Sequence, residues 1–321
     1  MREITYAQAG LEAVQEEMRR DDKVFYMSTD AILPLAKEFG TERMRATPIT
    51  ESTITGMAIG AAGSGFRPIC DWRQVTFCFV AMDQIVNQAA KITYMFGGQQ
   101  KFPILYRANV GGGGRLAAQH SQSPYSMFMN MSGLKIILAS TPRDLKGLLK
   151  SAIRDNNPVI SFEGNRLLQT KGEVPDADAD ELIPIGKADI KREGTDVTVV
   201  ALAWAVHEAL AAAETLAKEE GISVEVIDPR TIAPLDAETI RASVRKTGRL
   251  VIADEAGPVC GASAEIATLV TEDAATFKSL KVPVKRVCAL FVPIPYSPGL
   301  EDHVFPDRHK IADGIRAAMK A

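Results

Sequence analysis

The stretch TPITESTITGMAIG, residues 47–60, places a single carboxylate, Glu51, between an apolar turn and a helix of small residues. Gly56 and Gly60 are four residues apart and therefore share one face of that helix. Two glycines cost about 2 kcal/mol of helix propensity relative to alanine, so they favour a site where another helix or a ligand approaches the backbone closely. The alternative is a tightly packed helix in which Glu51 only stabilises the first turn through the helix dipole.

Short apolar segments alternate with amphipathic segments on both sides of this stretch. We expect strands at residues 24–27, 66–72, 103–107, 135–139 and 159–163. Between them we expect helices at residues 7–20, 32–39, 77–94 and 142–154. Such alternation predicts a parallel sheet that is covered by helices on both faces.

A second alternating series begins after a polar, charged segment. We expect its strands at residues 197–203, 222–227, 250–254 and 284–290. We expect its helices at residues 205–220, 236–247, 261–274 and 307–320. The sequence therefore predicts an α/β protein with two doubly wound domains, residues 1–175 and 197–321, joined by a linker at residues 176–196.

The composition indicates a globular protein and excludes some partners. The chain has 321 residues, of which 46% are hydrophobic, and a formal net charge of -3. This mild acidity gives no reason to expect nucleic acid or an anionic membrane as a partner. The first residues lack an apolar signal segment and no stretch has the length of a membrane span, so we expect a cytoplasmic location.

The cysteines are too far apart in the sequence for a zinc site. There is no C-x-x-C pair and no cluster of Cys and His. We therefore expect four buried, reduced thiols, at Cys70, Cys78, Cys260 and Cys288.

A run of four glycines, residues 111–114, follows the third expected strand and matches no phosphate-binding fingerprint. Six residues later comes His120, which is a catalytic candidate because a titratable imidazole lies beside a flexible loop. The alternative is a histidine with a structural role only. The remaining histidines have no spacing that suggests shared ligation, and we interpret them as surface or packing residues: His207, His303 and His309.

Several motifs in order resemble one family over nearly the whole chain. They are Glu51, Phe77, DQIVNQAAK at 83–91, AAQHSQ at 117–122, AIRDNNP at 152–158 and PIPYSP at 293–298. With these residues the chain resembles the beta subunits of thiamine-diphosphate-dependent 2-oxo acid dehydrogenases, which include the pyruvate, branched-chain and acetoin dehydrogenases. The resemblance implies a pyrimidine-binding domain, a transketolase-type C-terminal domain, and an enzyme of two alpha and two beta chains.

The resemblance also implies roles for three side chains. Glu51 would hydrogen-bond the ring nitrogen of the cofactor's aminopyrimidine and favour its imino tautomer, the form that removes the proton from the thiazolium carbon. Phe77 would lie against the pyrimidine, although plain core packing is the alternative. His120 would act near the substrate and the incoming lipoyl group.

The same resemblance implies bound metal ions and a partner chain. A potassium ion would be held mostly by main-chain oxygens at positions matching Ile104, Ala152, Ile153, Asp155 and Asn157. The chain has no G-D-G with a downstream Asn, so an alpha subunit carrying that motif would hold magnesium and the diphosphate. The face of Gly56 and Gly60 would contact this alpha subunit.

The other expected partners are a second beta subunit and the lipoyl acyltransferase. Relatives dock the acyltransferase on the C-terminal domain. Four acidic residues are candidates for charge complementarity there, with ordinary solvated carboxylates as the alternative: Asp254, Glu255, Glu301 and Asp302.

Three departures from the family pattern concern the substrate. Thr29 stands where an acidic residue is usual, the loop after Asp30 is shorter by roughly a dozen residues, and Ala46 replaces a common aspartate. Segments 94–98, 116–120 and 254–258 look most like acetoin dehydrogenase, so acetoin or pyruvate ranks above branched-chain 2-oxo acids.

Two further alternatives remain. The short loop favours the C-terminal half of a split transketolase, whereas the motif at residues 120–122 argues against it. A catalytically silent assembly subunit would have no need of Glu51, Phe77 and His120 together.

Overall fold

The computed structural model describes residues 1–176 and 179–320. The chain forms two compact units, one of Met1–Val110 with Met127–Ile185 and the other of Gly111–Ser126 with Gly186–Ala321. Residues 177, 178 and 321, which belong to the expected linker and C-terminal domain, lie outside the described residues.

The first unit is built on a parallel sheet. Its strands follow the order β6-β7-β5-β4-β2-β3. Their bounds are β2 Val24–Ser28, β3 Met44–Ala46, β4 Arg67–Gln74, β5 Leu105–Val110, β6 Lys135–Ile137 and β7 Val159–Gly164. The strands are buried almost throughout, as expected for a parallel sheet with both faces covered.

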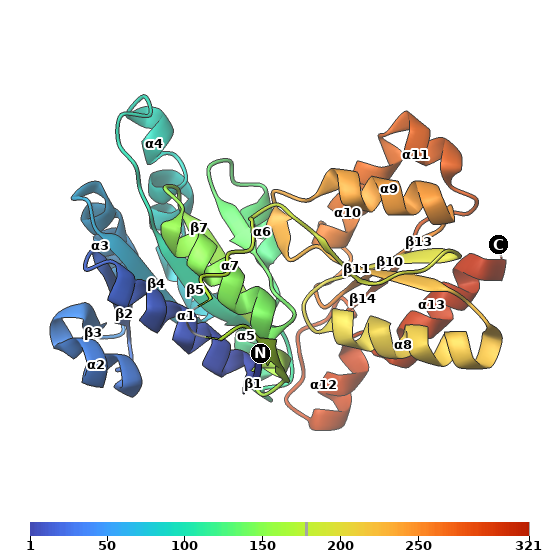
Figure 1. The fold of residues 1–321 in the computed structure, drawn as a ribbon, viewed down its shortest axis with the longest axis horizontal. Coiled ribbons are helices and arrows are strands. Elements are labelled where there is room, and N and C mark those ends of the chain that lie inside the picture. Colours follow the sequence, from blue (N-terminus) through green and yellow to red (C-terminus); the bar gives the residue numbers. More distant parts are fainter. Residues whose placement is uncertain (177–178, 321) are drawn as a thin grey trace. The chain divides into compact units, whose positions relative to one another are not determined.

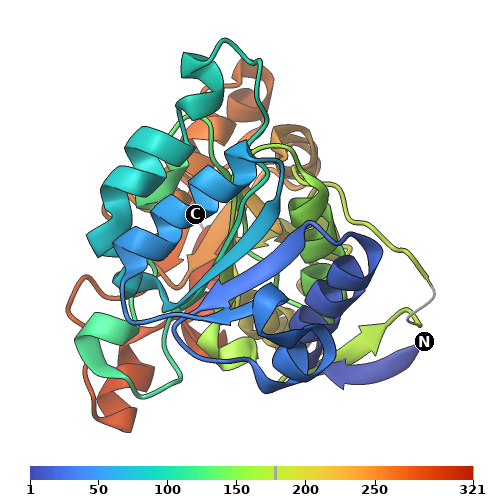
Figure 2. The same ribbon diagram turned by 90° about the vertical axis from the view of Figure 1, so that its left-hand side faces the viewer.

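Helices cover both faces of this sheet (Figure 1). On one face, α1 (Tyr6–Arg20) lies beside α7 (Pro142–Arg154), whereas α3 (Glu51–Gly63) lies on the other face, as Figure 2 shows. Helix α1 begins with a capping box between Thr5 and Gln8, and α7 is capped by Thr141. A Cβ at Gly10 would lie 3.1 Å from a Leu145 methyl carbon, so glycine permits the close approach of α1 and α7.

The segment expected as one helix over residues 77–94 is irregular. It consists of a 3₁₀ helix η1 (Val75–Ala81), a π helix η2 (Asp83–Ala89) and a short α4 (Ile92–Met95). The buried residues of η1 are Val75, Cys78 and Ala81, which recur every three residues. This period fits a 3₁₀ helix, in which side chains three apart lie above one another.

Other elements of the first unit are short. Helix α2 (Leu33–Arg43) contains a break at Gly40, whose φ of 71° is not helical, so the expected end of the helix at Gly40 appears as a kink. The remaining short elements are β1 Arg2–Thr5, β8 Lys171–Val174 and η3 Asn165–Leu167, while α6 Tyr125–Met129 begins in the second unit and ends in the first. Strands β1 and β8 pair antiparallel.

The second unit has its own sheet with strand order β14-β13-β10-β11-β9. The strands are parallel except for β9, which runs antiparallel to β11. The strand bounds in this unit are β9 Asp189–Arg192, β10 Val197–Ala201, β11 Val224–Asp228, β12 Thr231–Ala233, β13 Leu250–Asp254 and β14 Lys285–Cys288. Strand β9 lies inside the segment expected as a linker, because its backbone adds an edge strand to this sheet.

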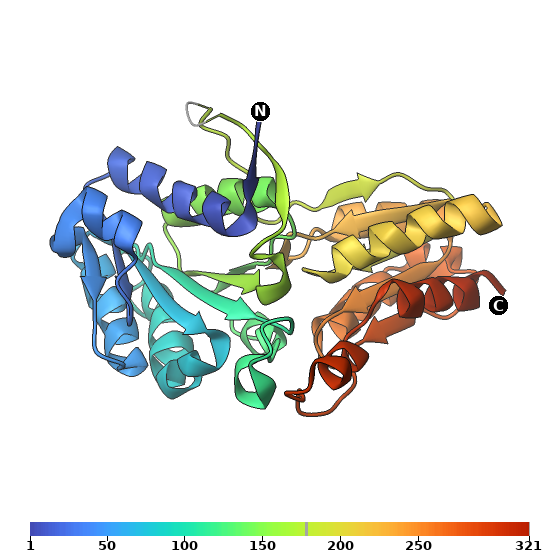
Figure 3. The ribbon, with the colours of Figure 1, turned by 90° about the horizontal axis from the view of Figure 1, so that it is seen from below.

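Helices cover this sheet as well. The bounds are α5 Ala117–His120, α8 Ala205–Glu220, α9 Ala237–Thr247, α10 Ala262–Thr271, α11 Ala274–Ser279, α12 Pro298–Val304 and α13 Arg308–Lys320. Helices α8 and α13 pack side by side (Figure 3). The expected helix 261–274 is divided into α10 and α11, since Asp273 caps a new helix through the Thr276 N–H.

No helix in the described part of the chain is both long and apolar enough to cross a bilayer.

Candidate active site

Glu51 is the first residue of α3 and is only 7% exposed. Within residues 1–176 and 179–320, no side chain donates a hydrogen bond to its carboxylate and no cation pairs with it. A nearly buried carboxylate is costly without a partner, so its position calls for one.

The beginning of α3 is held against the sheet and against η1. The Trp72 indole N–H donates to the Thr55 hydroxyl at 2.9 Å, and the ring of Trp72 stacks on Tyr106 with centroids 4.7 Å apart. The Ser52 hydroxyl donates to the Val80 carbonyl in η1. These contacts give Glu51 a rigid support.

Phe77 lies in η1 of the same compact unit and is half-buried. The structure thus places Glu51 and Phe77 on two helical segments that are in contact.

The two glycines of α3 face different surroundings. A Cβ at Gly56 would lie 3.8 Å from Gln84 Cγ, whereas a Cβ at Gly60 would meet nothing within 4 Å. Gly60 is exposed, and so is the neighbouring Met57 at 46%. The chain's own packing therefore does not require glycine at residue 60.

His120 belongs to the second compact unit, at the end of the short α5. It is half-buried and follows the glycine run, in which Gly111 and Gly113 have φ of 79° and 96°. The sequence predicts a flexible loop beside His120. In the structure, hydrogen bonds to Glu301 in the same unit hold this loop.

The acidic residues expected to dock the acyltransferase are mostly inaccessible. Asp254, Glu255 and Glu301 are buried, and Asp302 pairs with Arg115. Docking through Asp254, Glu255 and Glu301 is therefore wrong, because buried carboxylates cannot meet a partner's surface. Of the four, only Asp302 is exposed, and its carboxylate already accepts hydrogen bonds from Arg115.

Four of the carbonyls expected to hold potassium accept hydrogen bonds: those of Ile104, Ala152, Ile153 and Asp155. Arg67 donates to the carbonyls of Ile153 at 2.9 Å and Asp155 at 3.0 Å. The Ile104 carbonyl accepts from the Val159 N–H at 2.9 Å. The Ala152 carbonyl accepts the Asp155 N–H at 3.3 Å, and the Asn157 amide donates to the Asp155 carboxylate at 3.1 Å. Each carbonyl has a second lone pair, but a guanidinium already lies against two of them.

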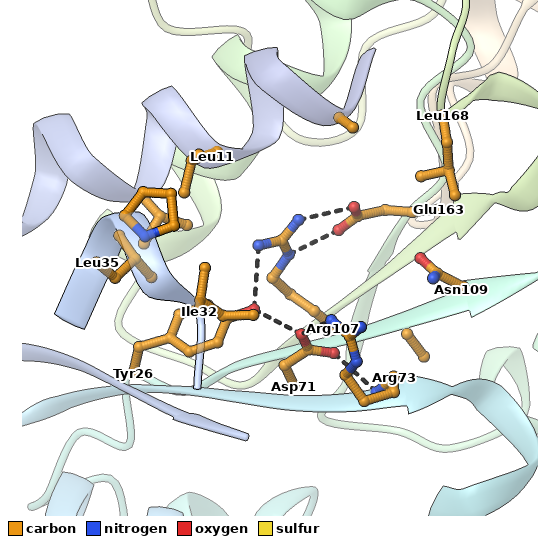
Figure 4. A pocket seen from close by; sticks show the side chains of 14 residues that line it. Leu11, Tyr26, Ile32, Leu35, Asp71, Arg73, Arg107, Asn109, Glu163 and Leu168 are labelled. Carbon is orange, nitrogen blue, oxygen red and sulfur yellow. Dashed lines mark hydrogen bonds and ion pairs between the residues drawn. The ribbon is translucent and has the colours of Figure 1, made fainter. Parts of the chain in front are cut away.

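A polar pocket in the first unit was not anticipated from the sequence (Figure 4). Its volume is about 310 Å³, and an apolar wall that includes Leu11, Leu35 and Leu168 faces polar groups. The polar groups come from the four strands β2, β4, β5 and β7: Tyr26, Asp71, Arg73, Arg107, Asn109 and Glu163. The chain passes from β2 to β3 on one side of β2 and returns to β4 on the other. Ligands of doubly wound sheets bind at such a reversal.

All of these polar side chains except Asn109 belong to one network, drawn in Figure 4, in which the Arg107 guanidinium also reaches the Tyr26 hydroxyl at 3.4 Å. Arg107 binds Glu163 through two hydrogen bonds of 2.7 Å, and the Tyr26 hydroxyl donates to Asp71 at 2.6 Å. Burial opposes the charge of Arg107, but the Glu163 carboxylate outweighs burial and raises the pKa of Arg107. Burial, with the Asp71 carboxylate, also raises the pKa of Tyr26, so this hydroxyl keeps its proton.

Arg73 stands at the rim of the pocket in a strained conformation. Its φ is 65°, in a left-handed region that non-glycine residues seldom adopt, and the pairing of β4 with β5 shifts register here. Its guanidinium is 3.4 Å from Asp30 and 3.7 Å from Asp71. Charged residues at the ends of apolar strands are the sequence signal that would have indicated this pocket.

The cysteines differ from the expectation of four buried thiols. Cys70 and Cys78 are buried, Cys288 is half-buried, and Cys260 is exposed. In the described ranges, no group of three or more His, Cys, Asp or Glu side chains is close enough to hold a metal ion.

Two family models match the chain in succession. The transketolase pyrimidine binding domain matches residues 2–171, and the transketolase C-terminal domain matches residues 186–311. A solved structure, a split gene transketolase described as an inactive beta4 tetramer, has a TM-score of 0.82 and covers 99% of this chain and 98% of its own. At 22% identity, this likeness shows the fold alone.

Curated relatives match over nearly the whole chain. The acetoin:2,6-dichlorophenolindophenol oxidoreductase subunit beta of Cupriavidus necator is 44% identical and covers 96% of this chain and 95% of its own length. The 2-oxoisovalerate dehydrogenase subunit beta of Bacillus subtilis is 42% identical over 98% of each chain. The pyruvate dehydrogenase E1 component subunit beta of Rhizobium meliloti is 41% identical over 99% of this chain and 70% of its own. The chain therefore belongs to the beta subunits of the thiamine-diphosphate-dependent 2-oxo acid dehydrogenases, in the transketolase-like superfamily.

Proposed function

We propose that this chain is the beta subunit of a heterotetramer that cleaves pyruvate or acetoin next to a carbonyl group. The acyl group would pass to the lipoyl acyltransferase. The observation that supports this most is Glu51, a nearly buried carboxylate at the start of α3 that no side chain of the described residues satisfies. A ligand that shares a proton with Glu51 accounts for this arrangement.

The residues present fit thiamine diphosphate. Glu51 would hold a proton at the ring nitrogen of the aminopyrimidine, and the half-buried Phe77 would lie against the flat face of that ring. When bound, the cofactor supplies the electron sink for cleavage next to the carbonyl. His120 would donate or accept a proton at the substrate or the lipoyl group.

The chain would hold only half of the cofactor. It has no G-D-G with a downstream Asn, so we propose that an alpha subunit holds magnesium and the diphosphate. The exposed face at Gly60 is proposed to contact that subunit, with Gly56 beside it. A second beta subunit completes the heterotetramer.

Acetoin and pyruvate are proposed ahead of branched-chain 2-oxo acids. The relatives named for these three substrates are 41–44% identical to the chain, so identity alone does not separate them. The segments that resemble acetoin dehydrogenase support the order. A split transketolase half remains the second enzyme candidate because the fold is shared with one, and sugar-phosphate substrates would distinguish it.

Potassium is proposed at the carbonyls of Ile104, Ala152, Ile153 and Asp155, with Asn157 beside them. Their oxygens suit a hard cation, but the Arg67 guanidinium would weaken its binding. The thermal unfolding temperature in KCl should be higher than in NaCl at equal ionic strength. Equal unfolding temperatures in the two salts would contradict a potassium site.

The test of the catalytic proposal is Glu51→Gln in the enzyme reconstituted with its alpha chain. Turnover of pyruvate and acetoin should be abolished, while gel filtration shows an intact complex, because glutamine is the same size but cannot share the proton. Glu42→Gln, at an exposed carboxylate of α2, is the matched control and should retain activity. Appreciable turnover by Glu51→Gln would favour the silent assembly subunit.

A further inference from the structure

The segment Gly111–Ser126, which carries His120, is fastened to the second compact unit. At its end the Tyr125 hydroxyl donates to Asp254. Asp254 ends β13, next to β10, where the strand order of this sheet reverses. Doubly wound sheets usually bind a ligand at that position. Here the side chain of Tyr125 binds at that position, at the end of β13.

Arg115 makes the second connection. Its guanidinium donates to Glu301 at 2.6 Å, to both carboxylate oxygens of Asp302 at 3.0 Å, and to the Pro298 carbonyl at 3.0 Å. Glu301 is fully buried, and its other oxygen accepts the Gly113 N–H at 2.8 Å. Both oxygens of one buried carboxylate in α12 therefore hold the same loop.

The backbone of this loop needs such support. Arg115 and Ala117 have φ of 54° and 60°, in the left-handed region that is unfavourable for side chains other than glycine. Gly112 allows close contact, because a Cβ there would lie 2.2 Å from a ring carbon of Phe305. Charge-assisted hydrogen bonds keep a strained loop in one conformation.

We propose that Arg115 and Glu301 are positioning residues, whose ion pair fixes the glycine loop and thereby the place from which the His120 imidazole acts. This inference rests on the proposed role of His120 in transfer to the lipoyl group. The buried acidic residue of α12 then serves the geometry of the loop, and not the docking of a partner.

The experiment uses the enzyme reconstituted with its alpha chain and two assays. One follows reduction of dichlorophenolindophenol, an acceptor that needs no lipoyl group. The other follows acylation of an isolated lipoyl domain. Arg115→Gly is the informative variant, because glycine adopts the left-handed backbone without steric strain while the guanidinium is lost.

Arg115→Gly should lower kcat for lipoyl acylation about 10- to 100-fold with little change in KM, and should leave dye reduction near the wild-type rate. Glu301→Gln should act in the same direction, and the double variant should be no worse than the more impaired single variant. Arg316→Ala is the control, because it removes an exposed ion pair with Glu220 in the same unit. Amide exchange in residues 111–120 should be faster in Arg115→Gly than in this control.

The outcomes separate the two proposals. If His120→Ala leaves lipoyl acylation intact, the proposed role of His120 is wrong, and the inference about Arg115 is overturned with it. If His120→Ala impairs acylation but Arg115→Gly does not, only the positioning role is overturned. If His120→Ala lowers acylation alone but Arg115→Gly lowers both activities equally, the ion pair serves stability and not the position of His120, which also overturns the proposal.

Discussion

Arg107 and Glu163 form a two-pronged ion pair between the neighbouring strands β5 and β7, with both N–O distances at 2.7 Å. The side chains are only 14% and 6% exposed. Removing one partner from such a buried pair leaves a charge without compensation, which costs more than the pair contributes as a whole. The loss of stability on substitution here should therefore depend on whether one partner or both are replaced.

Glu163→Ala should lower the free energy of unfolding by about 3–5 kcal/mol, measured by urea denaturation. Replacing both Arg107 and Glu163 by methionine should restore most of that loss, because no unpaired charge stays buried. Glu38→Ala is the control at an exposed pair with Arg19 and should cost less than about 1 kcal/mol. A double variant as unstable as Glu163→Ala would contradict this account.

Gly60→Ala should change stability and assembly in opposite directions. The isolated chain should gain about 1 kcal/mol, because alanine is the better helix former and its Cβ meets nothing within 4 Å. Association with the alpha subunit should weaken if that face is the contact. Thr215→Ala, at an exposed position of α8, should also stabilise the chain but leave association unchanged. Unchanged association of Gly60→Ala, measured by calorimetry, would exclude this face as a close contact.

Asp155→Asn should remove a contribution to the free energy of unfolding that depends on pH. Burial raises the pKa of Asp155, but the Lys135 ammonium and the Asn157 amides outweigh burial and lower it overall. A carboxyl whose pKa is lowered in the folded state stabilises the protein above its unfolded pKa of about 3.9, and this contribution is lost as the pH falls further.

The measurement is urea unfolding at several pH values. At pH 7 the free energy of unfolding of the wild type should be about 1 kcal/mol larger than that of Asp155→Asn. This difference should shrink as the pH falls below about 4. Lys135→Met should show the same trend, because it removes the other half of the ion pair. A difference that grows on acidification would have the wrong sign.

Thiol labelling of the isolated chain should begin at Cys260. It is exposed, whereas burial raises the pKa of Cys78 to about 12 and also raises that of Cys70, so neither forms the reactive thiolate at neutral pH. Mass spectrometry after brief alkylation at pH 7.5 should find the label at residue 260, and Cys260→Ser should remove this fast phase. Early labelling of Cys70 would show that the core opens readily.

Regular helices and strands were predictable from the sequence because local signals agree with the tertiary fold. Helix α8 and strand β13 have the expected bounds, and Gly221 ends α8 in the left-handed conformation, with φ of 69°. Glu51 is recognisable in the sequence because it precedes an unusual helix with two glycines. Such signals are contained within a few turns of the chain.

The polar pocket depends instead on registration between strands. Asp71 becomes a neighbour of Ser28 only because β2 and β4 pair in parallel, and Arg107 reaches Glu163 across β5 and β7. Local sequence can place these charged residues on their strands, but it does not predict which of them pair. The same holds for Arg115 and Glu301, whose hydrogen bond joins residues 186 positions apart.

That separation has a consequence during synthesis of the protein. The segment with His120 is synthesised first, and nearly two hundred further residues must be added before α12 can bind it. At about 5–20 residues per second this takes roughly 10–40 s, during which Arg115 has no Glu301 to bind. A product that stops short of residue 301 could complete its first sheet but not this loop. Maturation of the loop is therefore postponed until the end of translation, so incomplete chains cannot reproduce the arrangement around His120.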